Sequence, residues 1–352
     1  MNDQNIHIAL ATDDNYFEGL LVTAWSIAAN CSRAGDIIFH ILDGGISHDN
    51  ISLLKKSLAR FNCSMDFIRV DQGTQLHGCG TWHGNSSMTF ARLLLPSLLP
   101  TVKHVIYSDV DFLWLKDVAQ LWQHADDAIL LQHAHHDQIC SISSAEHDWC
   151  KARGTALIPN AYFCAGMLLL NLEKFRAETL HVKMLDFIRA NGGSAPTQDQ
   201  TVLNMFCQTR NDIGIVDSSW QITTGNSAIE RLTSGLVLHY ASDTPWKPLR
   251  KVNHLLSNYH VLWHRVNGRI RGISTWASLR QHNSVLSILL CRTIFLLAAN
   301  FSAIKWLLCT FMRLRGRSGS INYLLSKLRN VRIDRTALDN LRSPQNATDC
   351  KA

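Results

Sequence analysis

Short apolar runs alternate with segments of helical periodicity in the N-terminal part of the chain. The runs at residues 6–11, 37–42 and 65–70 predict buried strands. Between them, apolar residues recur at helical spacing in residues 17–28 and 48–61, which predicts two helices. The order strand, helix, strand, helix, strand is typical of a sheet with parallel pairs and crossover helices. The pattern therefore predicts an α/β fold.

The same periodicities predict further elements downstream. Helices are expected at residues 87–95, 117–122 and 173–189 and after a Thr197 N-cap, and strands at 105–107, 129–132, 165–172 and 236–240. Two polar, irregular stretches separate these elements, residues 72–87 and residues 133–158. We expect the first to be a flexible loop and the second to line a substrate cleft.

A pair of aspartates interrupts the apolar stretch from His104 to Leu115, H-V-I-Y-S-D-V-D-F-L-W-L. Carboxylates at the end of a buried strand are costly to desolvate unless a cation or hydrogen bonds compensate them. In extended backbone, Asp109 and Asp111 would face the same side and could reach one hard divalent ion such as Mg²⁺ or Mn²⁺. A strand-to-loop turn with two solvated aspartates explains the spacing equally well.

Polar residues also follow the first predicted strand, where the chain continues as Asp13, Asp14 and Asn15. Ligands of open α/β sheets lie beyond the carboxyl ends of the strands. The Asp109/Asp111 pair and Asp13 to Asn15 both follow predicted strands. We therefore expect one site at that edge of the sheet.

The composition is that of a chain that buries a core, because 46% of the 352 residues are hydrophobic and only 18% are charged. The ten cysteines form no regular framework, and most have apolar neighbours, which favours reduced thiols in a cytoplasm. No basic segment followed by a long apolar run begins the chain, so no secretory signal is expected.

The C-terminal part differs from the rest in charge. The net charge of +6 is concentrated after Met312. The basic residues there include Arg313, Arg315, Arg317, Lys327, Arg329, Arg332 and Arg335. Residues 284–311 are apolar but interrupted by Arg292 and Lys305, which favours an amphipathic helix lying on an anionic membrane over a core helix or a membrane span. No RNA-binding pattern of aromatic residues is present, so no nucleic-acid partner is expected.

Several motifs in a fixed order resemble those of the glycosyltransferases of family 8, retaining enzymes of the GT-A fold, and especially bacterial lipopolysaccharide core glucosyl- and galactosyltransferases. The motifs are A-T-D-D-N-Y (11–16), F-H-I-L-D-G-G-I-S (39–47), T-F-A-R-L (89–93), V-I-Y-S-D-V-D (105–111), F-C-A-G-M-L-L-L-N-L (163–172), Q-D-Q (198–200) and H-Y (239–240) before P-W. The resemblance covers roughly residues 6–265. It implies a GT-A catalytic domain over residues 1–265, a Rossmann-like mixed sheet with flanking helices, followed by a helical, basic tail over residues 266–352.

The resemblance also implies roles for individual residues. Asp109, Asp111 and His239 would ligate Mn²⁺ or Mg²⁺ at the diphosphate of a UDP-sugar. Asp199 would bind the donor sugar and Gln200 would face its anomeric carbon. The remaining residues implied in donor binding are Ala11, Asp13, Asn15, Arg92, Val110, Ala165, Gly166 and Lys247.

The implied activity is transfer of glucose or galactose from UDP to a lipid-linked saccharide with an α linkage, at the inner face of the cytoplasmic membrane. Two alternatives remain open: a catalytically inactive sugar-nucleotide-binding protein and a metal-dependent phosphotransferase. This chain departs from the family pattern at Cys164, where Asn is usual, and at Thr244, where Lys is usual. Lys247 is a candidate replacement for that Lys. Asp137 is a candidate for the acidic residue of the following loop.

Overall fold

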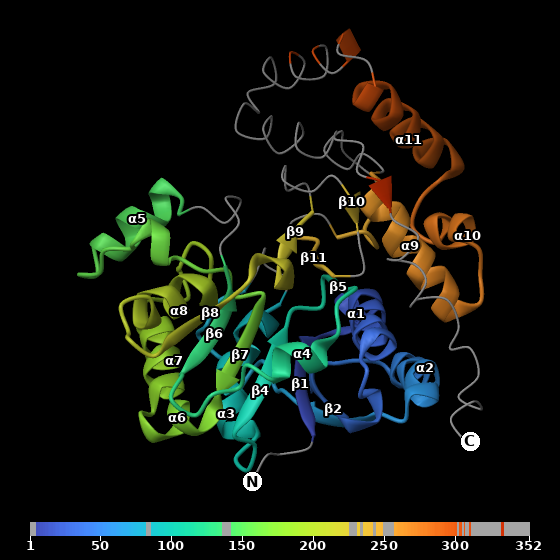
Figure 1. Ribbon diagram of the computed structural model, residues 1–352. Helices are drawn as coiled ribbons and strands as arrows, with labels where there is room; N and C mark the ends of the chain where they lie inside the picture. Colours follow the sequence, from blue (N-terminus) through green and yellow to red (C-terminus); the bar gives the residue numbers. More distant parts are fainter. Residues whose placement is uncertain are drawn as a thin grey trace.

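The computed structural model describes residues 5–81, 86–135, 142–224, 231–232, 235–241, 244–248 and 257–300, with residues 303–304, 306, 310 and 332–333. Its centre is a seven-stranded sheet of order β3-β2-β1-β4-β7-β6-β8 (Figure 1). The strands are β1 (Ile6–Thr12), β2 (Ile37–Asp43), β3 (Ser64–Arg69), β4 (His104–Ser108), β6 (Leu131–Ala134), β7 (Met167–Asn171) and β8 (Ile213–Val216). The predicted α/β class is confirmed.

One strand of this sheet runs against its neighbours. β7 is antiparallel to β4 and β6, whereas β1, β2, β3 and β4 pair in parallel, as do β6 and β8. Ser108 at the end of β4 therefore pairs with Met167 at the start of β7. The Asp109 N–H donates to the carbonyl of Gly166 at 2.8 Å. The residues that follow β4 and those that precede β7 thus meet at one edge.

Helices cover both faces of the sheet, as Figure 1 shows. Ile8 and Leu10 of β1 belong to the core that includes α1 (Phe17–Asn30) and α2 (His48–Leu58). Ala9 belongs to the opposite core, with η4 (Met88–Leu94), α3 (Leu95–Leu98), α6 (Leu172–Ala177), α7 (Leu180–Ala190) and α8 (Asp199–Cys207). Burial on both faces explains why β1 is mostly apolar and has no alternation of apolar and polar residues.

Several shorter elements lie outside these two cores' main helices and strands. They are α4 (Val118–Trp122), α5 (Ser144–Lys151), β10 (Arg231–Leu232), β12 (Arg332–Ile333) and the 3₁₀ turns η1 (Asp14–Tyr16), η2 (Ala34–Asp36), η3 (Ala59–Phe61), η5 (Pro159–Ala161) and η6 (Ser218–Trp220).

A second, three-stranded sheet is held against α1. It consists of β5 (Phe112–Trp114), β11 (Val237–His239) and β9 (Ile222–Thr223). The Thr23 hydroxyl lies 2.8 Å from the carbonyl oxygen of Val110 and 2.7 Å from that of Phe112. Ser26 accepts the N–H of Trp114 at 3.0 Å. Buried polar groups of an otherwise apolar helix therefore fix the backbone around the aspartate pair.

Some predicted elements need correction. Residues 173–189 form two helices, α6 and α7, because Thr179 between them has a left-handed φ of 52°. Thr197 is not the N-cap of α8; that position is Gln198, and the Thr197 hydroxyl instead donates to Glu146. The predicted strand at 129–132 lies at Leu131–Ala134, and the predicted helix at 87–95 is mostly 3₁₀.

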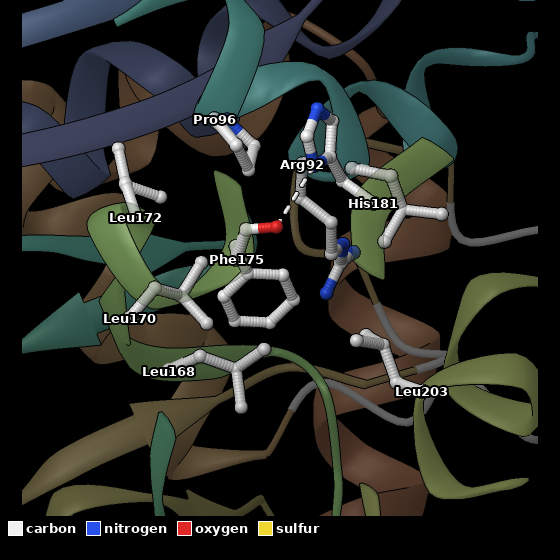
Figure 2. Close-up of a pocket in the computed structure, with 9 residues that line it drawn as sticks. Arg92, Pro96, Leu168, Leu170, Leu172, Phe175, His181 and Leu203 are labelled. Carbon is white, nitrogen blue, oxygen red and sulfur yellow. Dashed lines mark hydrogen bonds between the residues drawn. The ribbon is translucent and has the colours of Figure 1, made fainter. Parts of the chain in front are cut away.

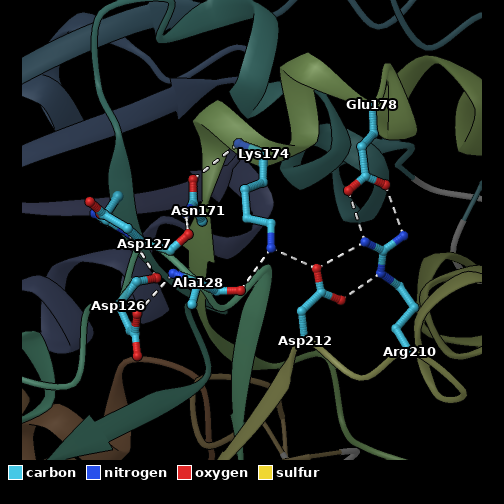
Figure 3. A network of polar contacts seen from close by, with 9 residues as sticks. Asp126, Asp127, Ala128, Asn171, Lys174, Glu178, Arg210 and Asp212 are labelled. Atoms are coloured by element: carbon cyan, nitrogen blue, oxygen red, sulfur yellow. Dashed lines mark hydrogen bonds and ion pairs between the residues drawn. The ribbon is translucent and has the colours of Figure 1, made fainter.

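A charged network lies at the β8 edge of the large sheet (Figure 3). Arg210 binds Glu178 through two hydrogen bonds of 2.8 Å and Asp212 through two of 2.8 and 2.9 Å. Lys174 of α6 adds an ion pair of 2.8 Å to Asp212. The side-chain hydrogen bond from Arg210 is the largest influence on the pKa of Asp212 and holds it well below its usual range.

Three C-terminal helices follow: α9 (Asn258–Arg271), α10 (Thr275–Arg280) and α11 (Val285–Asn300). Leu262 and Trp263 of α9 pack into the core that contains α1, and Arg271 forms an ion pair of 2.5 Å with Glu18 of α1. The predicted boundary between residues 265 and 266 lies within α9. The division into a catalytic domain and a tail stays a prediction.

Helix α11 carries apolar residues on more than one side. Ile288 and Phe295 are buried, whereas Leu286, Leu289 and Leu290 are 74%, 53% and 55% exposed. Arg292, which interrupts the apolar stretch in sequence, donates to Asn258 of α9 at 2.9 Å. Within the part of the chain that the structure describes, no helix has the length and apolarity needed to cross a membrane.

Candidate active site

Asp109, Asp111 and His239 form a cluster at the edge predicted from the sequence. Each offers a ligand atom, and these atoms all lie within 4.8 Å of one another. Asp109 and Asp111 lie in the turn between β4 and β5 and not in the extended backbone that was predicted. The turn, and not strand geometry, brings their two carboxylates to one side. His239 joins them because β11 pairs with β5, which places His239 opposite Phe112.

Neighbouring rings fix the orientation of His239. Its ring stacks on Phe112, with centroids 4.2 Å apart and an angle of 8° between planes. A Cβ at Gly166 would lie 3.1 Å from the rings of both His239 and Phe112. Any larger residue at position 166 would therefore crowd the cluster.

The charges of the cluster are only partly compensated by protein groups. Burial raises the pKa of Asp109 to about 6, although the Arg92 charge opposes this shift. Burial of His239 disfavours its protonation, but the Asp111 carboxylate outweighs this and raises its pKa well above its usual range. The thiol of Cys164 contributes to that rise. Asp111 Oδ1 lies 3.3 Å from His239 Nε2 without hydrogen-bond geometry.

These residues fit a hard divalent cation. Two carboxylates and an imidazole are ligands that Mn²⁺ and Mg²⁺ accept. The side-chain amide of Gln221 lies 3.5 Å from His239 Nδ1, and its Oε1 is buried without a hydrogen-bond partner among the described residues. With the amide turned by half a rotation, Oε1 would accept the Nδ1–H and leave Nε2 as a ligand. Gln221 was not predicted, because only the fold brings it to His239.

Arg92 links the cluster to the start of α8. Its guanidinium donates to Asp109 Oδ1 at 2.7 Å and to the carbonyl of Ala165, and its Nε lies 2.8 Å from Asp199 Oδ2. The Nε–H points at the carbonyl of Thr89, 3.2 Å away, so the contact with Asp199 is an ion pair rather than a hydrogen bond. The Arg92 side chain is only 4% exposed.

The surroundings of Arg92 strengthen these contacts. Figure 2 shows a small cavity beside Arg92 that is lined mainly by apolar residues, including Leu168, Phe175 and Leu203. The guanidinium carbon also lies 4.3 Å from the ring centre of Tyr107. Ionic contacts are stronger in such a medium than in water. Arg92, which was predicted to bind the donor, is therefore a buried cation that holds Asp109 and Asp199 in place.

Asp199 is held by side chains that come much earlier in the chain, Thr89 and Arg92. The Thr89 hydroxyl donates to Asp199 Oδ1 at 2.6 Å. Burial raises the pKa of Asp199, against the opposing influences of Arg92 and Thr89. Gln198 before it has φ 56° and ψ −125°, a strained conformation for a residue with a side chain. Tyr107 and Thr89 were not singled out from the sequence, although both lie within the recognised motifs.

Gln200 has a defined amide orientation. Its Oε1 accepts the N–H of Ala165 at 3.1 Å, and its Nε2 donates to the hydroxyl of Tyr162 at 2.8 Å. Gln200 is thus tied to the segment before β7, next to the Gly166 that packs on His239. The predicted pair Asp199–Gln200 and the predicted metal ligands belong to one connected group.

The residues after β1 lie on a neighbouring part of the same edge, because β1 pairs in parallel with β4. Asp13 is buried and accepts the N–H of Asn15 at 3.0 Å, and Asn15 is exposed. Ala11 belongs to the core that also contains Ala165. The structure places Lys247 against Tyr16, with Nζ 2.7 Å from the hydroxyl and 4.4 Å from the ring centre. Asp137 lies outside the described residues.

The chain belongs to glycosyltransferase family 8. A sequence model of the family described as "Glycosyl transferase family 8" matches residues 7–250. The fold is that of the GT-A glycosyltransferases, and the predicted family is confirmed. The family assignment favours a glycosyltransferase over the phosphotransferase alternative.

Individual relatives agree with this assignment. The chain is 26% identical over 204 residues to General stress protein A of Bacillus subtilis (strain 168), covering 57% of this chain and 67% of that protein. It is 27% identical over 205 residues to a putative glycosyltransferase of Haemophilus influenzae, covering 58% of this chain and 60% of that protein. The crystal structure of the galactosyltransferase LgtC in complex with donor and acceptor sugar analogs matches with a TM-score of 0.56 and 26% identity, covering 68% of this chain and 89% of that chain.

Proposed function

We propose that the protein is a retaining glycosyltransferase that moves a hexose, glucose or galactose, from UDP to a lipid-linked saccharide such as a lipopolysaccharide core, with an α linkage. The observation that carries the proposal is the connection, through Arg92, of the Asp109–Asp111–His239 cluster to Asp199 and Gln200. A metal-binding group and a sugar-binding group adjoin at the carboxyl edge of the sheet, as transfer from a sugar diphosphate requires.

The donor diphosphate is proposed to bind at the aspartate cluster. A bound Mn²⁺ or Mg²⁺ supplies Lewis acidity that offsets the charge of the departing UDP. Asp13 and Asn15 would hold the uracil and ribose, next to Ala11 at the end of β1. Lys247 is a second candidate cation for this side of the donor, since it contacts Tyr16 in the turn that follows Asp13.

The donor sugar is proposed to lie between Gly166 and the start of α8. Asp199 would fix the sugar hydroxyls, and the amide oxygen of Gln200 would stabilise positive charge that develops at the anomeric carbon. An amide is a poor covalent nucleophile. We therefore propose front-face substitution, in which the departing phosphate accepts the proton of the acceptor hydroxyl. A sugar found covalently attached to any wild-type side chain would contradict this route.

The acceptor is proposed to be presented at an anionic membrane surface. Leu286, Leu289 and Leu290 form an exposed apolar stripe on α11, and the sequence that follows is strongly basic. Apolar insertion and basic charge together give the two contributions that stable surface attachment requires. This supports a location at the inner face of the cytoplasmic membrane. Removal of residues 284–352 is expected to release the protein from the membrane fraction; unchanged fractionation would contradict attachment through the tail.

The function is tested with a panel of UDP-hexoses and Mn²⁺, using membrane extracts as the acceptor source. We expect UDP release that depends on the extract, with a product whose mass increases by one hexose. UDP-galactose is the first donor to try, because LgtC is a galactosyltransferase. The Asp109→Asn variant is the matched control and should release no UDP above background.

Other outcomes would favour the alternatives. Binding of UDP with Mn²⁺ but no turnover on any extract would favour the catalytically inactive binding protein, for which the departure at Cys164 is the motivating observation. Release of phosphate from a phosphomonoester without release of UDP would favour the phosphotransferase.

A further inference from the structure

A buried carboxylate lies behind Gln200, outside the predicted site. Glu146 of α5 is fully buried, and its Oε1 accepts hydrogen bonds from three hydroxyl groups. The donors are Tyr162 at 2.9 Å, Thr197 at 2.7 Å and Thr201 at 2.7 Å. Helix α5 is drawn to one side of the sheet in Figure 1, and no motif of the sequence analysis includes Glu146. A buried carboxylate so densely bonded requires an explanation.

The direction of these hydrogen bonds has a consequence for Gln200. A carboxylate oxygen only accepts, so the single hydroxyl hydrogen of Tyr162 is used on Glu146. The phenol oxygen can then only accept from its other neighbour, and Gln200 must present its Nε2–H to it. The Gln200 Oε1 consequently points the other way, toward the N–H of Ala165.

We propose that Glu146 and Tyr162 are positioning residues that fix the amide orientation of Gln200, so that its oxygen rather than its nitrogen faces the donor sugar. The inference rests on the proposed function for its catalytic meaning. Without this relay only the Ala165 N–H would hold the amide orientation. A half rotation would then place the NH₂ group where it repels the positive charge that the oxygen stabilises. The relay adds a role for α5, which contributes no residue to the predicted site.

Kinetic comparison of matched variants tests the proposal. Tyr162→Phe removes the hydroxyl that joins Glu146 to Gln200, and Glu146→Leu removes the carboxylate. Tyr162→Phe is expected to lower kcat about tenfold while the donor KM changes less than about twofold. Thr201→Val removes a hydrogen bond from the same carboxylate but not from the relay. It should lose stability and keep kcat within about twofold of the wild type.

A double variant separates positioning from a structural role. In the Gln200→Ala background, Tyr162→Phe should change kcat by less than about twofold, because the group that it positions is gone. A full additive loss would show that Tyr162 acts independently of Gln200 and would overturn the proposal. An equal loss of kcat in Thr201→Val and Tyr162→Phe would do the same. If Glu146→Leu does not fold, the Tyr162 and Thr201 variants still decide.

Neutron crystal structures of the wild type, Tyr162→Phe and Thr201→Val distinguish the amide oxygen from the NH₂ group and provide a readout that does not need turnover. Gln200 should keep one amide orientation in the wild type and in Thr201→Val and should lose it in Tyr162→Phe. An unchanged Gln200 in Tyr162→Phe would overturn the positioning role. Absence of turnover by the wild type would instead overturn the proposed function, and the crystal structures would still decide the role of Tyr162.

Discussion

Two regions of the described structure bury polar side chains in opposite ways. At the sheet edge, Arg92 is buried as a charge between Asp109 and Asp199. Between α9 and α10, His264 is buried as a neutral ring, with Nδ1 2.9 Å from the hydroxyl of Ser278 and Nε2 3.1 Å from the carbonyl of Pro245. The pKa of His264 is lowered to about 3, mainly by burial.

The difference follows from what each region must hold. Neutral hydrogen-bonded groups pack helices together at little electrostatic cost. Buried charges are costly unless partners compensate them, and Asp111 Oδ1 of the cluster is buried without a hydrogen-bond partner among the described residues. Such an uncompensated carboxylate oxygen is useful where a cation binds. We therefore expect ligand binding to change the region around Arg92 and the aspartate cluster. We expect acid to destabilise the region around His264.

The largest expected effect comes from neutralising one carboxylate of the cluster. Asp109→Asn or Asp111→Asn should lower transfer about 10³-fold and remove its dependence on Mn²⁺, because the leaving diphosphate loses its compensation. Thermal unfolding should shift by only a few degrees, since each change removes a half-buried charge without adding volume. Enzyme assays over a range of Mn²⁺ concentrations measure the first effect, and calorimetry measures the second.

His239→Ala provides a graded companion to these variants. It keeps both carboxylates, so transfer should persist at a higher Mn²⁺ requirement. Unfolding of the aspartate variants at the assay temperature would show that Asp109 and Asp111 have a structural role. An unchanged Mn²⁺ requirement in His239→Ala would exclude that ring as a ligand.

Removing the central charge should affect activity and stability together. Arg92→Met leaves the buried Asp199 and the half-buried Asp109 without their cation, and loss of one partner of a buried ion pair typically costs about 3–5 kcal/mol. The double variant Arg92→Met, Asp199→Asn should recover part of the stability but none of the activity. Urea unfolding of the wild type and both variants measures this recovery. Equal stability of the single and double variants would show that Arg92 and Asp199 are not coupled.

The sequence predicts the strands and helices that carry the site better than the tertiary hydrogen bonds that hold them. Short apolar runs predict β1, β2 and β4, and helical spacing predicts α1, because each element carries its own local pattern. The break at Thr179 is missed because both flanking segments continue the helical spacing. Thr23 is unexplained in sequence because its partners, Val110 and Phe112, are far along the chain.

The site shows the same limit. Motif residues such as Asp109 and Asp199 are predicted because their types and order carry the information. Glu146 and Tyr162 are missed because a buried carboxylate or phenol has no local signature. Only hydrogen bonds that join α5, the segment after η5 and α8 bring them to Gln200. Tertiary hydrogen bonds of this kind are invisible to periodicity.

Acid should lower the stability of the protein through the buried neutral histidines of α9. Burial lowers the pKa of His260 to about 4 and that of His264 to about 3. The unfolded chain, whose histidines have a pKa of about 6.5, then binds more protons than the folded protein below that pH. The free energy of unfolding should fall by about 1.4 kcal/mol per pH unit for each histidine as the pH drops from about 6 toward 4.

Replacement of both rings tests this assignment. The double variant His260→Gln, His264→Gln should be less stable at neutral pH but should have a shallower dependence of stability on pH. Urea unfolding between pH 7 and pH 4 measures both slopes. Identical slopes for the wild type and the variant would assign the acid sensitivity to other groups.

The smallest expected effect concerns backbone strain at the charged edge. Gln198 has φ 56° and ψ −125°, and its Oε1 is buried without a hydrogen-bond partner among the described residues. Gln198→Gly should raise the free energy of unfolding by about 1 kcal/mol, because relief of strain exceeds the added flexibility of glycine. It should also lower kcat severalfold, since Asp199 and Gln200 follow a looser turn.

Asn62 is the matched control: its φ is also 56°, but its ψ of 19° is a conformation that asparagine tolerates. Asn62→Gly should therefore give no stability gain and no change in kcat. An equal gain at both positions would attribute the effect to glycine itself, and the strain at Gln198 would then have no special link to the active site.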